Sequence, residues 1–135
     1  ALRGHDGGDT GRAITVTQNG WAYAGWYLNV HLWGKTGSTW TRMQVAQLDL
    51  GFAAMVRNKI QGLPWRVCAR VDGPVLTVKL WSASQPEPSW SDATHTNHAT
   101  LPEGWLRAGR VGWYAGHLKA GNFLVYDGIA AATSR

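Results

Sequence analysis

The acidic residues are too scattered to supply the paired carboxylates of a glycosidase. Glycoside hydrolysis usually needs two carboxylates that face each other across a cleft. On a β-sandwich we would expect them two residues apart on one strand, but no two of the eight acidic residues share an expected strand. Both glutamates, Glu87 and Glu103, fall in expected loops. A Ser-His-Asp triad is equally unsupported, because the chain has no G-x-S-x-G motif. We therefore expect no catalytic residues and no enzyme activity.

Histidine and cysteine do not indicate a metal site. His95 and His98 lie near Asp92, but the spacing is loose and no third ligand has a helix or hairpin to hold it. Two histidines in a polar loop are more often solvated, so we expect no metal and no cofactor. Cys68 is the only cysteine, which excludes an internal disulfide and a cysteine zinc site within this sequence.

The most informative stretch is WRVCARVDGPVLTVKLW, residues 65–81, which reads as a β-hairpin. Its turn centres on Asp72-Gly73 or on Gly73-Pro74, and both registers give the same two faces because side chains alternate along a strand. One face is apolar and predicts core: Trp65, Val67, Ala69 and Val71 opposite Leu76, Val78 and Leu80. The other face mixes cations with one indole: Arg66, Cys68 and Arg70 with Val75, Thr77, Lys79 and Trp81. This second face is expected to meet water or a ligand.

A sugar is one ligand that would fit this polar-aromatic face. Sugars stack their C–H faces on aromatic rings, and the guanidinium of arginine is a strong forked donor. Segment 26–33 carries a second stripe of this kind, which includes Tyr27, His31 and Trp33. The hypothetical binding set is therefore the following: Trp81, Arg66, Arg70, Lys79, Trp33, His31 and Tyr27. The alternative is that a strand, a loop or a partner subunit covers the face, with Trp81 packed under arginine stems.

Period-2 alternation recurs along the rest of the chain and predicts an all-β fold. Besides the hairpin strands 65–72 and 75–82, the expected strands are 12–18, 26–33, 40–50, 109–115 and 121–132. The face of segment 40–50 switches near Val45-Ala46, which suggests a bulge or two strands. Segment 51–58 is the one helix candidate, although it is bracketed equally well as a strand. The architecture expected is an antiparallel β-sandwich.

The nine tryptophans sort into three groups on this basis. Trp26, Trp65 and Trp113 belong to apolar faces and are predicted to be core. Four others lie near turns or strand ends, where indoles commonly plug a sandwich: Trp21, Trp40, Trp90 and Trp105. Trp33 and Trp81 remain as candidates for ligand contact.

Length and charge limit the domain organisation and the class of partner. The 135 residues suit one domain over 12–135, with 1–11 as a linker or edge segment, and we expect it to be a C-terminal domain of a longer chain. The net charge of +5 comes from scattered basic residues, and a nucleic-acid surface needs clustered ones. No apolar run approaches 18 residues, so we expect no membrane-spanning segment.

Four motifs follow one another in the second half of the chain: the 65–81 hairpin, PEPSW, AGRVGWYAG and FLVYDGIAAAT. In this order they resemble the C-terminal part of concanavalin A-like (laminin-G-like) jelly-roll domains over residues 64–133. The resemblance is closest to the versions in minor tail and other virion proteins of phages that infect actinobacteria. Residues 1–63 carry no motif of that family, and the chain lacks the carboxylate strand of its hydrolase branch and the calcium loop of its legume-lectin branch.

The resemblance implies a tail-associated adhesion or structural module, located in the virion tail or outside the cell. Its expected partners are a host cell-envelope polysaccharide and other virion subunits, including copies of itself as a homo-oligomer such as a trimer. Two alternatives remain open: a purely structural oligomerisation domain and a polysaccharide hydrolase of the same fold. The family tends to be longer than this chain, which suggests that another segment or subunit supplies one or two strands.

Overall fold

The computed structural model describes residues 2–5, 10–18, 27–49, 64–105, 109–116 and 118–132. These residues form two antiparallel β-sheets and no helix, so the all-β prediction is confirmed for them. Within the same ranges the protein therefore has no helix that is long and apolar enough to cross a membrane.

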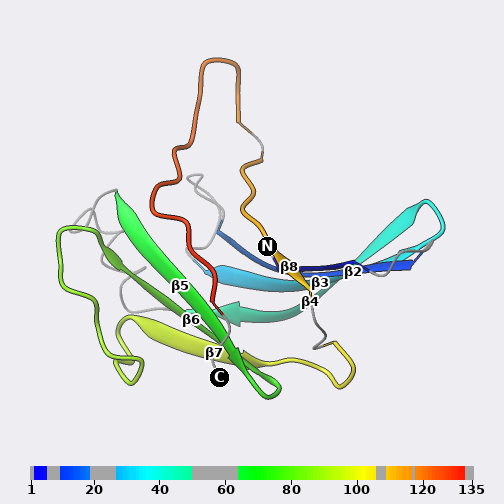
Figure 1. The fold of residues 1–135 in the computed structure, drawn as a ribbon, viewed down its shortest axis with the longest axis horizontal. Coiled ribbons are helices and arrows are strands. Elements are labelled where there is room, and N and C mark those ends of the chain that lie inside the picture. Colours follow the sequence, from blue (N-terminus) through cyan, green and yellow to red (C-terminus); the bar gives the residue numbers. More distant parts are fainter. Residues whose placement is uncertain are drawn as a thin grey trace.

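The larger sheet has five strands in the order β4-β3-β2-β1-β8 (Figure 1). Their bounds are β1 Leu2–His5, β2 Thr10–Gln18, β3 Leu28–Thr36, β4 Thr39–Leu48 and β8 Arg110–Val111. The long meander β2-β3-β4 reproduces the expected strands 12–18, 26–33 and 40–50 within a few residues. The expected bulge is also present: Val30 pairs with Ala46 and His31 with Gln44, which leaves Val45 as the extra residue.

The smaller sheet has three strands in the order β5-β6-β7, with bounds β5 Trp65–Asp72, β6 Val75–Ser82 and β7 Thr96–Thr100. The β5–β6 hairpin takes the second of the two expected registers, since Asp72 pairs with Val75 around Gly73-Pro74. Gly73 has a φ of +52°, which a glycine adopts readily at the first central position of a tight hairpin turn. β7 was not expected from the sequence.

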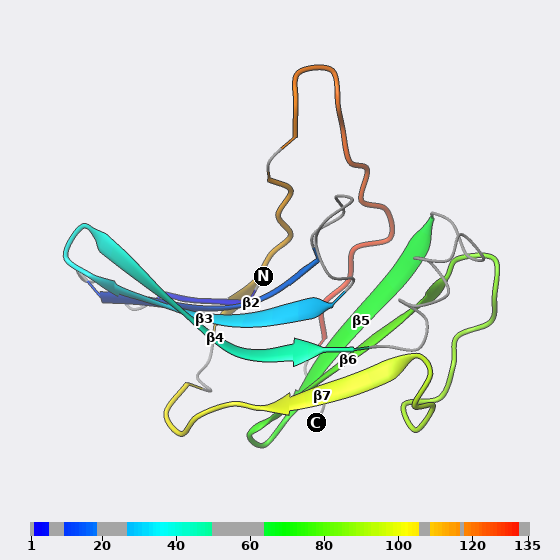
Figure 2. The ribbon, with the colours of Figure 1, turned by 180° about the vertical axis from the view of Figure 1, so that it is seen from behind.

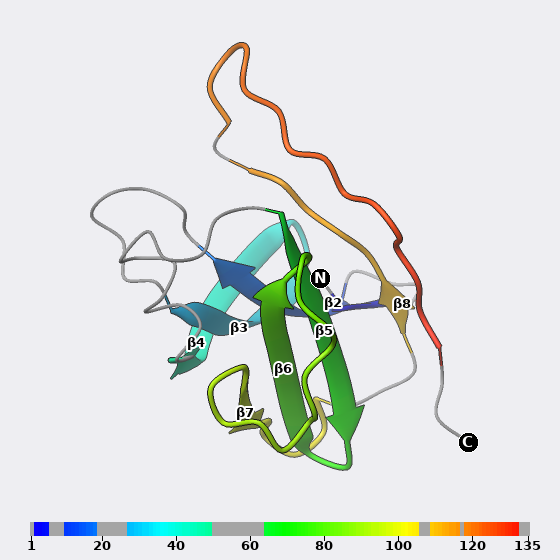
Figure 3. The same ribbon diagram turned by 90° about the vertical axis from the view of Figure 1, so that its left-hand side faces the viewer.

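The two sheets share one apolar core, and Figures 2 and 3 show the smaller sheet lying across the larger one. The larger sheet contributes Ile14, Leu28, Val30, Leu32 and Leu48, and the smaller one contributes Leu76, Val78, Leu80 and Ala99, followed by Leu101. Burying a side chain of this size stabilises the fold by about 1.5–3 kcal/mol. The apolar stripe of β6 is therefore core, as the alternation predicted.

The expected core face is only half right on β5. Val67 is 39% exposed, Ala69 is exposed, and Trp65 and Val71 are partly buried against the core. The reason is position: β5 lies at the edge of its sheet, whereas β6 lies between β5 and β7. A central strand is covered on both sides by its neighbours, and an edge strand is not.

The strands expected at 109–115 and 121–132 are the largest error. Only Arg110 and Val111 form a strand, β8, and residues 118–132 are extended without any strand. Trp113, predicted to be core, is 44% exposed. The segment 2–5, expected to be part of a linker or edge, instead forms β1. The predictions for Trp21, Trp26 and segment 51–58 lie outside the described residues.

Candidate binding site on the three-stranded sheet

The outer face of the three-stranded sheet, turned away from the core, carries most of the predicted site. Because Leu76, Val78 and Leu80 enter the core, the alternate residues of β6 point outward. Strand pairing sets these residues in cross-strand rows: Arg70–Thr77–His98 forms one row and Cys68–Lys79–Thr96 the next, with Arg66 opposite Trp81 beyond them. The hairpin therefore does collect the four predicted hairpin residues on one surface.

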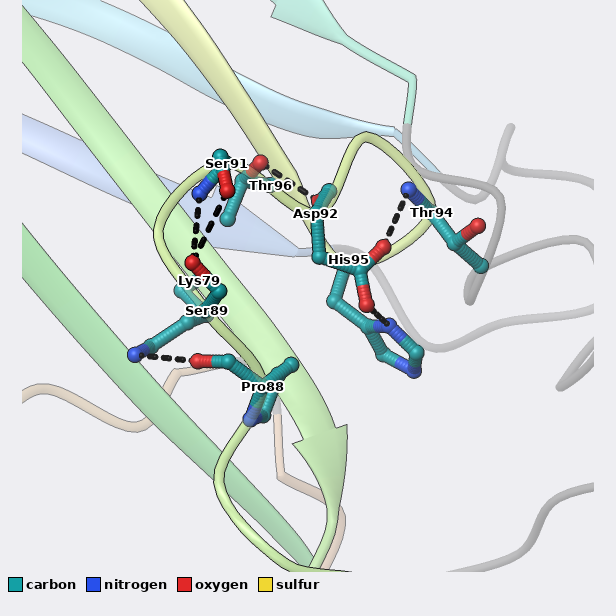
Figure 4. Close-up of polar contacts among 8 residues, drawn as sticks. All are labelled: Lys79, Pro88, Ser89, Ser91, Asp92, Thr94, His95 and Thr96. Atoms are coloured by element: carbon teal, nitrogen blue, oxygen red, sulfur yellow. Dashed lines mark hydrogen bonds and ion pairs between the residues drawn. The ribbon is translucent and has the colours of Figure 1, made fainter.

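The loop of residues 83–95 covers one half of this surface. Lys79 is 1% exposed, and its Nζ donates to Glu87 Oε1 at 2.6 Å. The same Nζ donates to the carbonyl oxygen of Pro88 at 2.9 Å, the contact that Figure 4 draws. A buried ammonium group is costly unless it is paired and hydrogen-bonded. Glu87 and Pro88 satisfy that requirement, so the ion pair holds the loop against the sheet.

Trp81 lies beside this ion pair and is also enclosed. It is 2% exposed, and Lys79 Nζ lies 5.3 Å from its ring centroid. Its Nε1 is buried and has no hydrogen-bond partner among the described residues. The expectation that this face meets water or a ligand therefore fails at Trp81 and Lys79, because both side chains are buried and the loop that follows β6 supplies the partners of Lys79. This is the covering arrangement that the sequence left open as the alternative.

Trp90, from the same loop, marks the boundary between the covered and the open half. Lys79 Nζ lies 4.2 Å and the Arg70 guanidinium carbon 4.4 Å from the centroid of this ring. Both distances are within the range of cation–π attraction. Trp90 remains partly exposed, so it presents a fixed indole at the surface.

The half of the outer face that the loop leaves uncovered contains a hollow of about 590 Å³ beside Trp90. Its lining includes the row Arg70–Thr77–His98, together with Trp90, Ser91 and Asn97. Arginine, histidine and hydroxyl side chains can all donate hydrogen bonds. The hollow therefore combines one indole with several polar groups on a stable sheet.

A compact turn at Asp92 fixes the end of the loop. One carboxylate oxygen accepts from the backbone N–H of Thr94 at 2.8 Å, and the other lies 2.9 Å from Nδ1 of His95 (Figure 4). The Asp92 carbonyl also accepts from the hydroxyl of Thr96 at 2.6 Å. The hydrogen bonds of the carboxylate, first that with the His95 side chain and then that with the Thr94 N–H, hold the pKa of Asp92 below its ordinary value. The turn thus leads directly into β7 and positions His98.

The second polar-aromatic stripe does not join this site. On β3, Val30 and Leu32 enter the core, so His31 and Trp33 point to the outer side of the other sheet. Trp33 Nε1 donates to Thr15 Oγ1 at 3.0 Å, and Tyr27 lies just before β3. The expected combination of the two stripes is therefore wrong, because the core separates them.

His31 is nearly buried, with 8% of its surface exposed. Burial, followed by the charge of Arg42, lowers its pKa below the ordinary value for histidine. A histidine in this state favours the neutral form. It suits packing within the sheet better than contact with an acidic ligand.

The remaining chemistry-bearing residues form no metal centre. No three His, Cys, Asp or Glu side chains of the described ranges gather closely enough to hold a metal ion. His95 contacts Asp92 in the turn, whereas His98 lines the hollow. Burial, with a smaller effect of Glu87, raises the pKa of the Cys68 thiol. That shift disfavours the reactive thiolate.

Trp90 and His98 are the site residues that the sequence reasoning missed. Trp90 was assigned to a plug at a strand end, and His98 to a solvated loop. The available signal was the PEPSW stretch, whose two prolines stiffen a loop between two strands. What could not be seen was that this loop folds back over β6.

Comparisons with protein-family models, curated proteins and solved structures found no match to this chain.

Proposed function

We propose that this chain is a carbohydrate-binding module and that the sugar lies in the hollow beside Trp90. One observation carries the proposal: a partly exposed indole, held by two cations, stands at the edge of an open hollow on a sheet. A sugar ring would stack its C–H face on Trp90, since an indole offers a large apolar surface of fixed geometry. Arg70 and His98 would donate hydrogen bonds to hydroxyl or carboxylate groups.

In this proposal the predicted binding residues divide into two roles. Arg70 contacts the ligand, and Arg66, which is exposed on the same strand, could meet a longer glycan. Lys79 and Trp81 are buried, so they support the site by holding the loop that carries Trp90. Trp33, His31 and Tyr27 belong to the opposite surface and take no part.

The biological setting is a separate part of the proposal and rests on the sequence motifs. We propose a jelly-roll β-sandwich of the concanavalin A-like kind, acting in a phage tail or virion as an attachment module. Its ligand would be a host cell-envelope polysaccharide, and no chemistry would be catalysed. Two of the supporting motifs, the 65–81 hairpin and PEPSW, are the ones that build the hollow. An all-β fold with two packed sheets is compatible with this architecture.

Binding to actinobacterial cell-wall polysaccharide tests the proposal through tryptophan fluorescence. The wild-type chain should show a saturable change in emission, and Trp90→Ala should abolish it. Arg70→Ala should weaken the apparent affinity at least severalfold, since a charge-assisted hydrogen bond is worth about 1.5–3 kcal/mol.

The matched control is Trp40→Ala, which removes a 47% exposed indole from β4 and should leave binding intact. No emission change with any envelope fraction would count against glycan binding. An unchanged signal in Trp90→Ala would count against this site. A reducing-sugar assay on the same polysaccharide tests the hydrolase alternative, for which we expect no product.

A further inference from the structure

The side chains that line the hollow beside Trp90 include two ionisable ones, and both are basic. These are Arg70 and His98, which lie at the two ends of one cross-strand row with Thr77 between them. The other lining residues are neutral, and several of them carry a hydroxyl or an amide group. Among the described residues, the wall of the hollow therefore offers hydrogen-bond donors and a guanidinium charge but no carboxylate.

Arg70 is exposed, and its guanidinium carbon lies 4.4 Å from the centroid of the Trp90 ring. This contact is a cation–π attraction, which does not consume the N–H donors of the group. Within the described ranges no hydrogen bond or ion pair engages those donors. A guanidinium in this state is suited to an anion, because its planar fork forms parallel hydrogen bonds with a carboxylate or a phosphate.

The acidic residues of the loop that borders the hollow have partners of their own. Glu87 Oε1 accepts from Lys79 Nζ at 2.6 Å. The Asp92 carboxylate lies 2.9 Å from His95 Nδ1, as Figure 4 shows. Among the described residues, neither carboxylate forms an ion pair with Arg70. The loop thus leaves the charge of Arg70 for a ligand.

The nearest acid on β5 itself is Asp72, two residues beyond Arg70 on the same face. It is exposed beside the hairpin turn, and within the described ranges it forms no ion pair with Arg70. About 7 Å of strand separates the two residues. An anion bound to the guanidinium would therefore meet Asp72 through water, where Coulomb repulsion is much weaker than a direct charge-assisted hydrogen bond.

The guanidinium is also held in place before a ligand arrives. Lys79 Nζ lies 4.2 Å from the centroid of the same Trp90 ring, and it is itself fixed by its hydrogen bonds with Glu87 and Pro88. Arg70 therefore lies against an indole whose own position is set by a hydrogen-bonded, buried ammonium group. A donor that is fixed in advance loses little conformational freedom on binding, and preorganisation of this kind raises affinity.

We infer that the hollow selects an acidic glycan and that Arg70 binds a carboxylate or phosphate group of the sugar stacked on Trp90. Strands about 4.8 Å apart place the Cα atoms of Arg70 and His98 about 10 Å apart. Only the short side chain of Thr77 lies between them in the row, so the hydroxyls of the sugar would reach Thr77 and His98. A neutral glycan would leave the guanidinium without an anion. The inference rests on the proposed function and narrows its class of ligand.

The test uses short oligosaccharide fragments of the acidic fraction of actinobacterial cell-wall polysaccharide, titrated into the 135-residue chain and followed by calorimetry. The matched probes are the same fragments after reduction of their carboxylates, and after hydrolysis of their phosphodiesters. Removing the acid group that the protein recognises should weaken binding about five- to tenfold, the loss of one charge-assisted hydrogen bond partly screened by water. The treatment that acts shows whether the acid is a carboxylate or a phosphate.

Arg70→Gln should weaken binding of the acidic fragments to the same extent and should change binding of the treated fragments by less than about twofold. Arg66→Gln is the matched control. It removes an exposed arginine from the same face of β5, opposite Trp81 and outside the lining of the hollow. This variant should keep the preference for the acidic fragments. Circular dichroism of both variants shows that they remain folded.

A salt titration of the wild type replaces Arg70→Gln if that variant misfolds. Affinity for the acidic fragments should fall between about 0.1 M and about 1 M NaCl, because the Debye length shortens from about 10 Å to about 3 Å. Affinity for the treated fragments should stay nearly constant. A salt response that is the same for acidic and treated fragments would contradict the inference.

Failure of this inference and failure of glycan binding give different results. Equal affinity for acidic and treated fragments overturns the acid preference but leaves glycan binding beside Trp90 intact. An acid preference that survives in Arg70→Gln, or that Arg66→Gln abolishes equally, overturns the role of Arg70. Absence of binding by every fragment overturns the proposed function and this inference together.

Discussion

The β5–β6 hairpin and the arm of residues 109–132 are built alike but use their apolar side chains in opposite ways. Each has two extended limbs rich in apolar residues, and each turns at a glycine with positive φ, Gly73 at +52° and Gly121 at +85°. In the hairpin, Leu76, Val78 and Leu80 are at most 1% exposed. In the arm, Phe123 is 82% exposed.

The difference shows that alternation and a turn are not sufficient to bury a strand. β6 has a neighbour on each side and a second sheet across its inner face. Among the described residues of the arm, only the two residues of β8 form a strand, and they pair with β1. Burial of an apolar side chain requires a second layer, and within the described ranges β6 has one whereas the exposed side chains of the arm do not.

The largest difference between the hairpin and the arm should appear when one apolar side chain in each is truncated to alanine. Leu80→Ala should lower the free energy of unfolding by about 2–5 kcal/mol, because it removes a buried side chain and leaves a cavity. Phe123→Ala should change it by less than about 0.5 kcal/mol in dilute, monomeric protein. Urea denaturation followed by circular dichroism measures both. Equal losses would mean that the arm packs on the core.

The two turn glycines offer a smaller contrast. Gly73→Ala should cost about 1–2 kcal/mol, since an L-residue is strained at positive φ. Gly121→Ala imposes the same local strain but at the tip of an arm outside the core. Its effect on global unfolding in dilute protein should therefore be much smaller. A comparable loss in both variants would show that the arm folds and unfolds together with the sheets.

The loop over the hairpin gives a third contrast. Glu87→Gln removes the carboxylate from buried Lys79 and should cost about 1 kcal/mol, a modest figure because Glu87 itself is largely exposed to solvent. Tryptophan emission should shift to the red as the loop loosens over Trp81. Glu103→Gln, at an exposed turn after β7, is the control. The same shift in both variants would contradict a holding role for the ion pair.

The smallest effect should come from the Asp92 turn and depends on pH. The pKa of Asp92 is lower in the folded chain than its ordinary value of 3.8. The turn therefore adds stability above pH 3.8, and this is lost as the pH falls toward the folded pKa. The melting-temperature difference between wild type and Asp92→Asn should shrink from pH 5 to pH 3. Asp127→Asn, in the arm, is the control, and a difference that is constant with pH would disprove the linkage.

Local features of the site could be predicted, and contacts between distant segments could not. The two faces of the hairpin follow from parity, so Arg70 and Lys79 were correctly placed on one side. The bulge at Val45 was visible as a switch of apolar face. The sequence did not predict that the 83–95 loop folds over Lys79, because the hydrogen bonds of Lys79 with Glu87 and Pro88 depend on the path of the loop in space. The separation of His31 from Arg70 was likewise decided by the sheet to which each strand belongs.

The sequence by itself therefore determined the all-β class, the strands of the meander and the hairpin, and which side chains share a face. These depend on alternation and turn chemistry over a few residues. Only the tertiary structure decided which faces are covered, because burial depends on neighbours that are distant in sequence. Among the described residues it buried Trp81, left Trp90 partly exposed, placed β5 at the edge of its sheet and left the apolar side chains of the arm exposed.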